Sequence, residues 1–482
     1  MPRPSRNTFV WLTTTSIILC TRILADDALP AKSKAATKPA AGPLRVHPQN
    51  PRYFTDGSGR AVYLTGAHTW SNLIDIGPQT PPAPFDFDAY LAFLARHHHN
   101  FIRLWTWEPA NWNASWDRQT VRHAVSMLPY ARTGPGNALD GKPKFDLTKY
   151  DANYFQRLRS RVQAAQERGI YVSIMLFEGW GMQFSPGAWQ AHPYHAANNV
   201  NGVDGDKDGD GKGLEVHTLA NPAVIALQEA YVRKVVDTVN DLDNALYEIS
   251  NENHPPSTKW QYHIIRFIKD YERGRPKQHP VGMTFQYQGG SNQTLLDGPA
   301  DWISPNPDAS PYDYRSNPPP ADGKKVVLSD TDHLWGIGGD RAWVWKSFLR
   351  GLNPLFMDPY NGVALGPRDD ARWDPIRRSL GYTLRYAERM DLAAMTPRAD
   401  LVSTKYCLAH PAKRGAEYLV YLPEGGGVTV DLRGSEGPLA VEWFDPKTGN
   451  TTRGEEVAGG GSRLCTAPFA GDAVLYLAGP KE

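Results

Sequence analysis

Short apolar runs alternate with amphipathic segments from Leu44 to Met395, and this pattern predicts strands and helices in turn. The predicted strands are 61–70, 101–107, 170–177, 245–250, 280–285, 302–304, 325–329 and 355–358. The predicted helices between them include 87–99, 151–168, 223–239, 260–272 and 343–349. This alternation is typical of an α/β fold, a (β/α)8 TIM barrel. The rival is a doubly wound open sheet, which is disfavoured because no glycine-rich phosphate loop follows the first strand.

The pattern changes after the predicted barrel, residues 44–395. From residue 396 to 482 the helical period is lost, and short strands are predicted at 401–408, 417–422, 428–432, 440–444 and 473–477. Glycine clusters separate several of these runs. Regular short strands with turn signals predict a small all-β sandwich domain.

The N-terminus has the order of a secretory signal peptide. Arg3 and Arg6 precede an apolar stretch that ends at Ala25. Residues 1–25 are therefore predicted to be removed on export, with an uncleaved anchor as the alternative. Residues 26–43 are rich in Ala, Lys and Pro and are predicted to form a linker. We expect a periplasmic or extracellular protein without membrane contact after cleavage.

Composition narrows the possible partners. Lys+Arg is 52 and Asp+Glu is 51, so the formal net charge of +1 gives no support to nucleic-acid binding. The 3 cysteines exclude a disulfide scaffold. Cys407 and Cys465 could pair after export, and the alternative is two buried free thiols.

Carboxyl groups and tryptophans gather where the predicted strands end. In a TIM barrel these ends form the functional face. The candidate binding residues are His68, Trp70, Arg103, Trp105, Trp107, Glu178, Trp180, Asn251, His333 and Trp335, and the candidate catalytic carboxyl groups are Glu252, Asp330 and Asp332. Tryptophan faces stack on sugar rings, and hydrolysis of a glycosidic bond needs two carboxyl groups. Glu178 and Glu108 are interpreted as substrate or structural ligands rather than catalysts.

Three segments carry a family resemblance. Residues 50–72 (NPRYFTDGSGRAVYLTGAHTWSN) are similar to the opening of apiosidase-like glycoside hydrolases. Residues 99–103 (HNFIR) and 247–253 (YEISNEN) resemble the second-strand and fourth-strand signatures of the large retaining-glycosidase clan of TIM barrels. The resemblance implies that Glu252 is the acid/base, that Asn251 holds a sugar hydroxyl, and that Arg103 steadies the nucleophile. The tail resembles the collagen-binding β-sandwich that often follows such barrels.

The end of the seventh predicted strand departs from the clan. The clan has a nucleophilic Glu there, whereas this sequence reads Ser329-Asp330-Thr331-Asp332-His333. Asp330 and Asp332 share strand parity, so both could face the barrel axis. We favour Asp330, with Asp332 beside His333 as the alternative. The shorter side chain could widen the carboxyl separation from the roughly 5 Å of retaining enzymes toward that of inverting ones. Arg103 could also pair with a structural Asp.

Residues 204–215 (DGDKDGDGKGLE) have the spacing of a calcium loop. The pattern D-x-[DN]-x-[DN]-G-x5-E is met in full. The predicted ligands are Asp204, Asp206, Asp208, Asp210 and Glu215. We expect a local, structural Ca²⁺, with a solvated acidic loop as the alternative, and no organic cofactor.

Together these features predict a secreted glycoside hydrolase. Its substrate is an oligo- or polysaccharide of plant or pectic type, cleaved by two carboxyl groups with retention. The alternative is a non-catalytic barrel that binds carbohydrate or matrix protein. A collagen-degrading protease is disfavoured, because the sequence has neither an H-E-x-x-H nor a G-x-S-x-G motif.

Overall fold

The computed structural model describes residues 38–114, 121–360 and 371–480. The predicted signal peptide and most of the predicted linker lie outside these residues. In the described part of the chain, no helix combines the length and the apolar character needed to cross a membrane.

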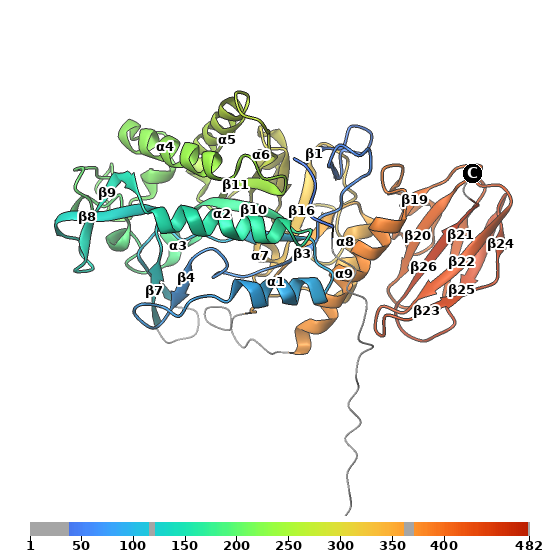
Figure 1. Ribbon diagram of the computed structural model, residues 1–482. Coiled ribbons are helices and arrows are strands. Elements are labelled where there is room, and N and C mark those ends of the chain that lie inside the picture. Colours follow the sequence, from blue (N-terminus) through green and yellow to red (C-terminus); the bar gives the residue numbers. More distant parts are fainter. Residues whose placement is uncertain (1–37, 115–120, 361–370, 481–482) are drawn as a thin grey trace, which may run out of the picture. The chain divides into compact units, whose positions relative to one another are not determined.

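Eight parallel strands form the predicted barrel (Figure 1). Their order around the sheet is β3-β17-β16-β13-β12-β11-β10-β5. Their bounds are Gly66–His68 (β3), Phe101–Leu104 (β5), Tyr171–Glu178 (β10), Ala245–Asn251 (β11), Val281–Thr284 (β12), Trp302–Ser304 (β13), Val326–Asp330 (β16) and Asn353–Met357 (β17). Each lies in or overlaps a predicted apolar run, so the TIM-barrel fold is confirmed.

Side-chain amides help to close the barrel between β3 and β5. The Thr65 N–H donates to Asn100 Oδ1 over 2.9 Å, and the Asn100 N–H donates to Thr65 O over 3.1 Å. Asn72 makes the same kind of bridge farther along, donating to Arg103 O and accepting from the Trp105 N–H, both over 2.7 Å. A Cβ at Gly66 would lie 2.2 Å from Phe101 O, so only glycine allows this close approach.

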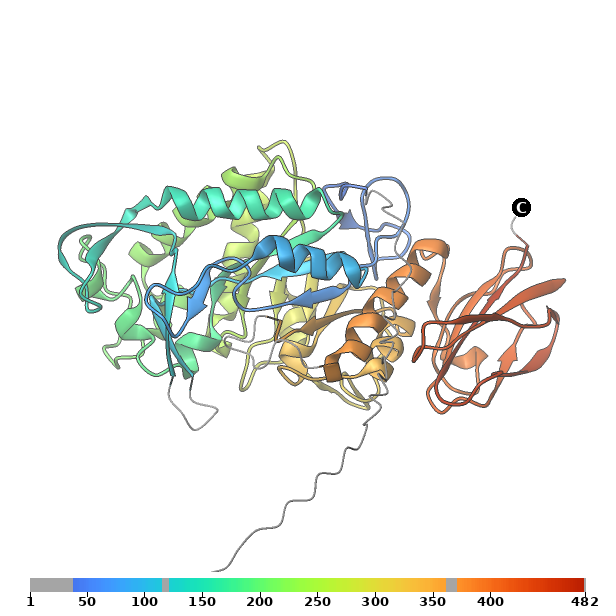
Figure 2. The same ribbon diagram turned by 60° about the horizontal axis from the view of Figure 1, so that its bottom comes forward.

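Helices cover the outside of the barrel, and α1 and α2 lie on neighbouring parts of it (Figures 1 and 2). Among the described residues, the α-helices of six or more residues are α1 (Phe87–Arg96), α2 (Ala152–Gln166), α4 (Pro222–Val239), α5 (Thr258–Glu272), α6 (Asn292–Asp297), α8 (Arg341–Leu349) and α9 (Asp374–Arg389). Asp86, Asp151 and Asn221 cap α1, α2 and α4 by accepting backbone N–H groups. The sequence analysis did not predict α9.

Two small antiparallel β-structures were not predicted either; four of their five strands lie between β5 and α2, and β4 lies between β3 and α1. The strands β4 (Asp75–Gly77), β6 (Asn111–Ala114) and β7 (Val121–Ser126) form one sheet. The strands β8 (Tyr130–Asn137) and β9 (Pro143–Tyr150) form a hairpin with register shifts. Their residues follow the carboxyl ends of β3 and β5, the side of the barrel where a site is expected.

The C-terminal region is the predicted all-β domain. One antiparallel sheet contains β18 (Thr396–Pro397), β19 (Cys407–His410), β20 (Glu417–Leu422), β26 (Ala473–Ala478), β22 (Pro438–Phe444), β23 (Thr451–Arg453) and β24 (Val457–Ala458). The facing pair is β21 (Gly427–Asp431) with β25 (Ser462–Thr466). The predicted strand at 401–408 is wrong over most of its length, because a 3₁₀ turn at Ala399–Leu401 and a bend precede β19.

The two cysteines of this region do not form the disulfide considered above. Both are free and buried in the core. Burial raises the pKa of the Cys407 thiol above its ordinary range, so it stays protonated and packs as a small apolar group.

The β-sandwich packs against α8 and α9 through a shared apolar cluster. Trp345 and Tyr386 of these helices pack with Tyr421 and Phe444 of β20 and β22. Arg341 at the start of α8 donates two hydrogen bonds to Asp472, at 2.9 and 2.7 Å. This contact lies beside the strands β16 and β17, whose ends contribute to the site described next.

Candidate active site

A pocket of about 610 Å³ lies at the carboxyl ends of the barrel strands. Its volume lies within the ordinary range for small-molecule sites, about 300–1,000 Å³. The residues that line it are Trp70, Trp105, Glu178, Trp180, Asn251, Glu252, Phe285, Tyr287, Pro307, Arg315, Asp332, His333, Leu334, Trp335, Gly336, Ile337 and Met357. Most of the predicted binding residues and two of the three predicted catalytic carboxyl groups are therefore brought together.

Arg103, at the end of β5, organises the floor of the site. Its Nε and Nη2 donate to the two carboxylate oxygens of Glu248, over 2.9 and 2.6 Å. Its Nη1 donates to Asp330 over 3.0 Å and to Asp332 over 2.9 Å. Arg103 and Glu248 are fully buried, so these ion pairs are shielded from water and from salt.

Asp330 lies beneath the pocket rather than on it. Its side chain is fully buried and lies 2.8 Å from His68 Nε2. It also accepts the Asp332 N–H over 3.0 Å, and so caps α7 (Thr331–Leu334). Burial alone would raise the pKa of Asp330, but His68 and Arg103 outweigh it and hold the pKa well below the ordinary range. The ionised form of Asp330 is therefore favoured, and its role in this geometry is structural.

Asp332 is the carboxyl group of this pair that lines the pocket. The predicted strand parity is wrong, because β16 ends at Asp330 and Asp332 already belongs to α7. Burial raises the pKa of Asp332, and the neighbouring Asp330 adds to this, while Arg103 opposes both. The geometry reverses our order of preference: Asp332 faces the cavity, and Asp330 fixes the turn that presents it.

Glu252 directly follows β11 and has a strained backbone with φ of +40°. A left-handed conformation is unusual for a residue other than glycine and is frequent at functional sites. The carboxyl group of Glu252 makes no hydrogen bond or ion pair with any described residue. Burial, with Asp332 as the next contribution, raises the pKa of Glu252 well above the ordinary range. The protonated form of Glu252 is therefore favoured.

Asn251 and His333 form a polar wall beside these carboxyl groups. Asn251 Oδ1 accepts from Arg103 Nη2 over 2.5 Å and lies 3.1 Å from His333 Nε2. The other ring nitrogen of His333 lies 2.6 Å from Ser304 Oγ. Burial lowers the pKa of His333 well below its ordinary value, so its ring is neutral and can offer a hydrogen bond without adding charge.

The tryptophans divide into two groups. Trp70, Trp105, Trp180 and Trp335 line the pocket as predicted. Trp107 does not: it is 1% exposed and packs edge-on against Trp70 at 5.3 Å. Trp107 therefore packs behind Trp70 and does not itself line the pocket.

His68 likewise lies outside the lining residues. It is 1% exposed, stacks on Trp105 at 5.7 Å and pairs with Asp330. The predictions that His68 and Trp107 contact substrate are therefore not met by this geometry, since both lie one layer behind the pocket.

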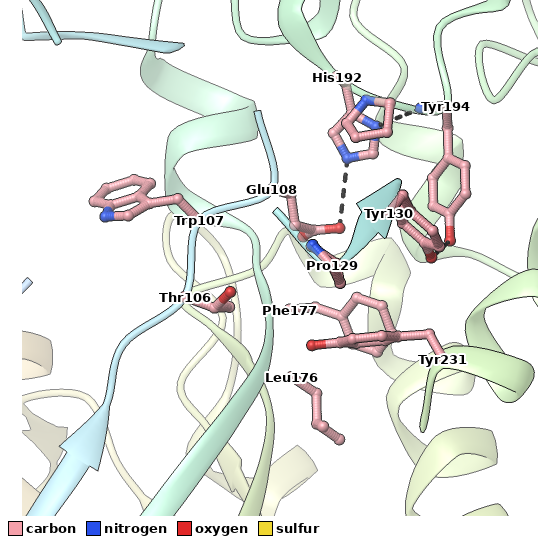
Figure 3. Close-up of a pocket in the computed structure, with 11 residues that line it drawn as sticks. Thr106, Trp107, Glu108, Pro129, Tyr130, Leu176, Phe177, His192, Tyr194 and Tyr231 are labelled. Atoms are coloured by element: carbon pink, nitrogen blue, oxygen red, sulfur yellow. Dashed lines mark hydrogen bonds and ion pairs between the residues drawn. The ribbon is translucent and has the colours of Figure 1, made fainter. Parts of the chain in front are cut away.

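Glu178 and Glu108 differ in protonation although they are close in space. Glu178 lines the pocket and accepts the Trp180 and Gly181 N–H groups, both over 2.8 Å. Burial raises the pKa of Glu178 well above its ordinary value. Glu108 lies instead in a separate cavity of about 20 Å³, near His192 and tyrosine side chains (Figure 3). His217 and His192 overcome the effect of burial and lower the pKa of Glu108 to about 2.

Several residues of the site were missed by the sequence analysis. Glu248 could have been found, because a lone charge within the apolar run 245–250 indicates a buried partner. Tyr287, Pro307, Arg315 and Ile337 lie in loops that follow the strands, where no periodicity places a side chain. Their positions depend on loop conformation rather than on local pattern.

The acidic loop at 204–215 is exposed and lies between β10 and α4. One carboxylate oxygen from each of Asp206, Asp208 and Asp210 lies within 4.8 Å of the others. Asp206 accepts the Gly209 and Gly211 N–H groups, which folds the loop back on itself. Glu215 Oε2 is buried and has no hydrogen-bond partner among the described residues. These hard oxygen donors suit Ca²⁺ chemically; Asp204 and Glu215 lie outside the three-residue group.

Solved structures of glycoside hydrolases resemble this chain over nearly its full length. One described as a glycoside hydrolase has a TM-score of 0.58 at 13% identity, covering 92% of this chain and 98% of the other. A glycoside hydrolase family 5 protein from Bacteroides vulgatus ATCC 8482 has a TM-score of 0.58 at 14% identity, with coverages of 92% and 95%. The similarity shows a common fold.

Two family descriptions match parts of the sequence. Residues 121–288 match a domain of unknown function, DUF6298. Residues 400–477 match the family described as "Putative collagen-binding domain of a collagenase", as the resemblance of the tail implied. No curated protein matches the sequence.

Proposed function

We propose that the protein is a glycoside hydrolase that cleaves O-glycosidic bonds at the barrel mouth. One observation carries the proposal: Glu252 and Asp332 line the same pocket, and only Asp332 has a guanidinium group beside it. Arg103 favours the ionised form of Asp332, whereas Glu252 has no such partner and its pKa is raised further. Two carboxyl groups with different protonation are what glycosidic hydrolysis requires.

In the proposed reaction Asp332 attacks the anomeric carbon while the bond from that carbon to the leaving oxygen breaks. Glu252 gives its proton to that oxygen. Water then attacks the glycosyl–Asp332 ester, Glu252 takes the proton from the water, and Asp332 leaves as a carboxylate. Asn251 is placed to hold a sugar hydroxyl, His333 fixes the orientation of Asn251, and the tryptophans on the pocket provide stacking faces.

The finer parts of the proposal rest on the sequence resemblance. These are the apiosidase-like subtype, the plant or pectic type of glycan, and retention of anomeric configuration. Because Asp is shorter than Glu, the separation of the two carboxyl groups decides between retention and inversion. A panel of plant oligosaccharides with NMR detection of the first-formed anomer gives both the substrate and the stereochemistry. Retention is expected, and first-formed product of inverted configuration would contradict the double displacement.

A second candidate function is a non-catalytic carbohydrate- or matrix-binding protein. Two observations favour it: Asp replaces the expected Glu on strand seven, and residues 400–477 match a collagen-binding description. Binding of the same panel with no release of reducing ends, or pull-down of collagen by the full chain, would support this candidate over the hydrolase.

We also propose that the loop 204–215 binds a structural Ca²⁺ and that the protein is exported. The converging oxygens of Asp206, Asp208 and Asp210 and the unpartnered Glu215 Oε2 support the ion. Calcium titration of the chelated protein by calorimetry tests it, and absence of a binding isotherm would contradict it. N-terminal sequencing of the protein from the periplasm or medium tests cleavage after Ala25.

A further inference from the structure

The rim of the pocket carries a guanidinium group that the proposed reaction does not use. Arg315 follows β15 (Tyr312–Asp313) and lines the pocket. Its Nε donates to Leu334 O, and its guanidinium carbon lies 5.9 Å from the centre of the Trp335 ring. Among the described residues, no Asp or Glu side chain pairs with Arg315. The group is therefore oriented by a carbonyl and a ring, while Nη1 and Nη2 keep their donors available.

The charges around the pocket make this position distinctive. Among the described lining residues, Arg315 is the only Lys or Arg. Arg103, beneath the floor, is already satisfied by Glu248, Asp330 and Asp332. An anionic group at the floor would meet carboxyl groups, whereas the same group at the rim would meet a guanidinium with free donors.

Exposed aromatic rings accompany Arg315 at the rim. Trp335 and Tyr287 are each 38% exposed and line the pocket. Trp335 is held edge-on by Trp343 at 5.6 Å, and Tyr287 by Phe184 at 5.4 Å. A fixed aromatic face beside a planar guanidinium suits a sugar ring that has an apolar C–H face and a carboxylate substituent.

We propose that Arg315 and Trp335 form a subsite for an acidic sugar, one whose carboxylate pairs with the guanidinium. The subsite rests on the proposed function, because it names the substrate class of the same pocket. Arg315 acts on specificity and takes no part in bond cleavage. Arg315 is exposed whereas Asp332 is buried, so the carboxylate of the sugar binds on the solvent side of the pocket, where the guanidinium offsets its charge.

Binding in the full-length Glu252→Gln background tests the subsite without turnover. The probes are trigalacturonate and its methyl ester, and a glucuronate-bearing xylo-oligosaccharide and its carboxyl-reduced form, measured by calorimetry. For at least one pair we expect the acidic member to bind about tenfold tighter, as for hydrogen bonds to charged groups. Adding Arg315→Gln should abolish this preference and leave the affinity of the neutral member within about twofold.

Arg266→Gln is the matched control. Arg266 is exposed and lies 5.8 Å from the Tyr262 ring on α5, with no ion pair among the described residues. It should leave both affinities unchanged. The inference is overturned if neither acidic probe is preferred, or if the preference survives Arg315→Gln. If the acidic probes are preferred but the wild-type protein hydrolyses none of them, the subsite is supported and the proposed hydrolase activity is contradicted. Failure of the subsite can therefore be told apart from failure of the proposed function.

Discussion

Two groups of acidic residues, one at the barrel mouth and one in the loop 204–215, show how environment decides what a carboxylate does. At the mouth, Asp330 and Asp332 are buried and ordered around Arg103. In the loop, Asp208 and Asp210 are exposed and bonded mainly to their own backbone. At the mouth, burial raises the pKa of Asp332, whereas His68 and Arg103 hold the pKa of Asp330 well below its ordinary range. In the loop, one carboxylate oxygen from each of Asp206, Asp208 and Asp210 lies within 4.8 Å of the others.

Replacing Asp330 and Asp332 one at a time with Asn tests the first half of this comparison most strongly. Asp332→Asn should lower kcat on the order of 10³-fold or more while the fold stays intact, because the nucleophile is lost. Asp330→Asn should instead cost about 3–5 kcal/mol of unfolding free energy, because Arg103 and His68 lose a buried counter-charge. Turnover and urea denaturation check both. Full activity of Asp332→Asn would mean that another residue is the nucleophile.

Removing the shared cation sharpens the contrast between buried and exposed ion pairs. Arg103→Met leaves Glu248 buried without its guanidinium partner and Asp330 with only His68 beside it, and should destabilise the protein by about 3–5 kcal/mol. Arg159→Met is the control, because Arg159 and Asp241 are 42% and 60% exposed in their pair. Its expected cost is within about 1 kcal/mol. Equal losses for the two variants would mean that burial does not set the strength of the Arg103 network.

The pH dependence follows from the two raised pKa values. Activity should fall at high pH as Glu252 loses its proton and at low pH as Asp332 gains one. The pH midpoints of both limbs should lie above about 4, the ordinary pKa of a carboxyl group. Both midpoints belong to Glu252 and Asp332 as an interacting pair. The profile of kcat/KM measures them. In Glu252→Gln the alkaline limb should disappear, and its persistence at the same pH would assign that limb to another group.

Calcium removal gives the smallest expected effect and tests the loop. Chelation should lower stability by about 2–3 kcal/mol relative to Ca²⁺ at a hundredfold excess over Kd. Asp208→Asn should abolish this difference, whereas Asp297→Asn, an exposed aspartate on α6, should preserve it. Thermal unfolding with and without Ca²⁺ provides the measurement. A chelator-insensitive wild type would make the loop a solvated acidic segment.

The sequence predicted those elements whose pattern depends only on residues close together in the chain. The barrel strands were found because strands buried on both faces are continuous apolar runs. Helix α9 was missed because Arg377 and Tyr386 on its buried side are polar, and each finds a partner only in the fold, in Asp358 and Glu442. The short strands β23 and β24 carry too little pattern to be recognised.

Most residues of the candidate site were predicted from the sequence, but which of them line the pocket and which lie behind it was not. Glu252 follows its strand directly, so its position was readable from the sequence. The order of Asp330 and Asp332 was not, because strand parity was extended past the residue at which β16 ends. Trp107 and His68 were predicted to line the pocket because they lie near strand ends. That position does not show whether a side chain reaches the cavity or lies behind its lining. Loop residues such as Arg315 carried no sequence signal at all.

The central claim is that Glu252 is the proton donor of a glycosidase, and the turnover of Glu252→Gln tests it most directly. The variant removes the acid and keeps the shape of a side chain that has no described hydrogen-bond partner. On an identified substrate, the kcat of Glu252→Gln should be about 10²–10⁴-fold below that of the wild type, and the free energy of unfolding should be unchanged. Turnover equal to that of the wild type would contradict the account.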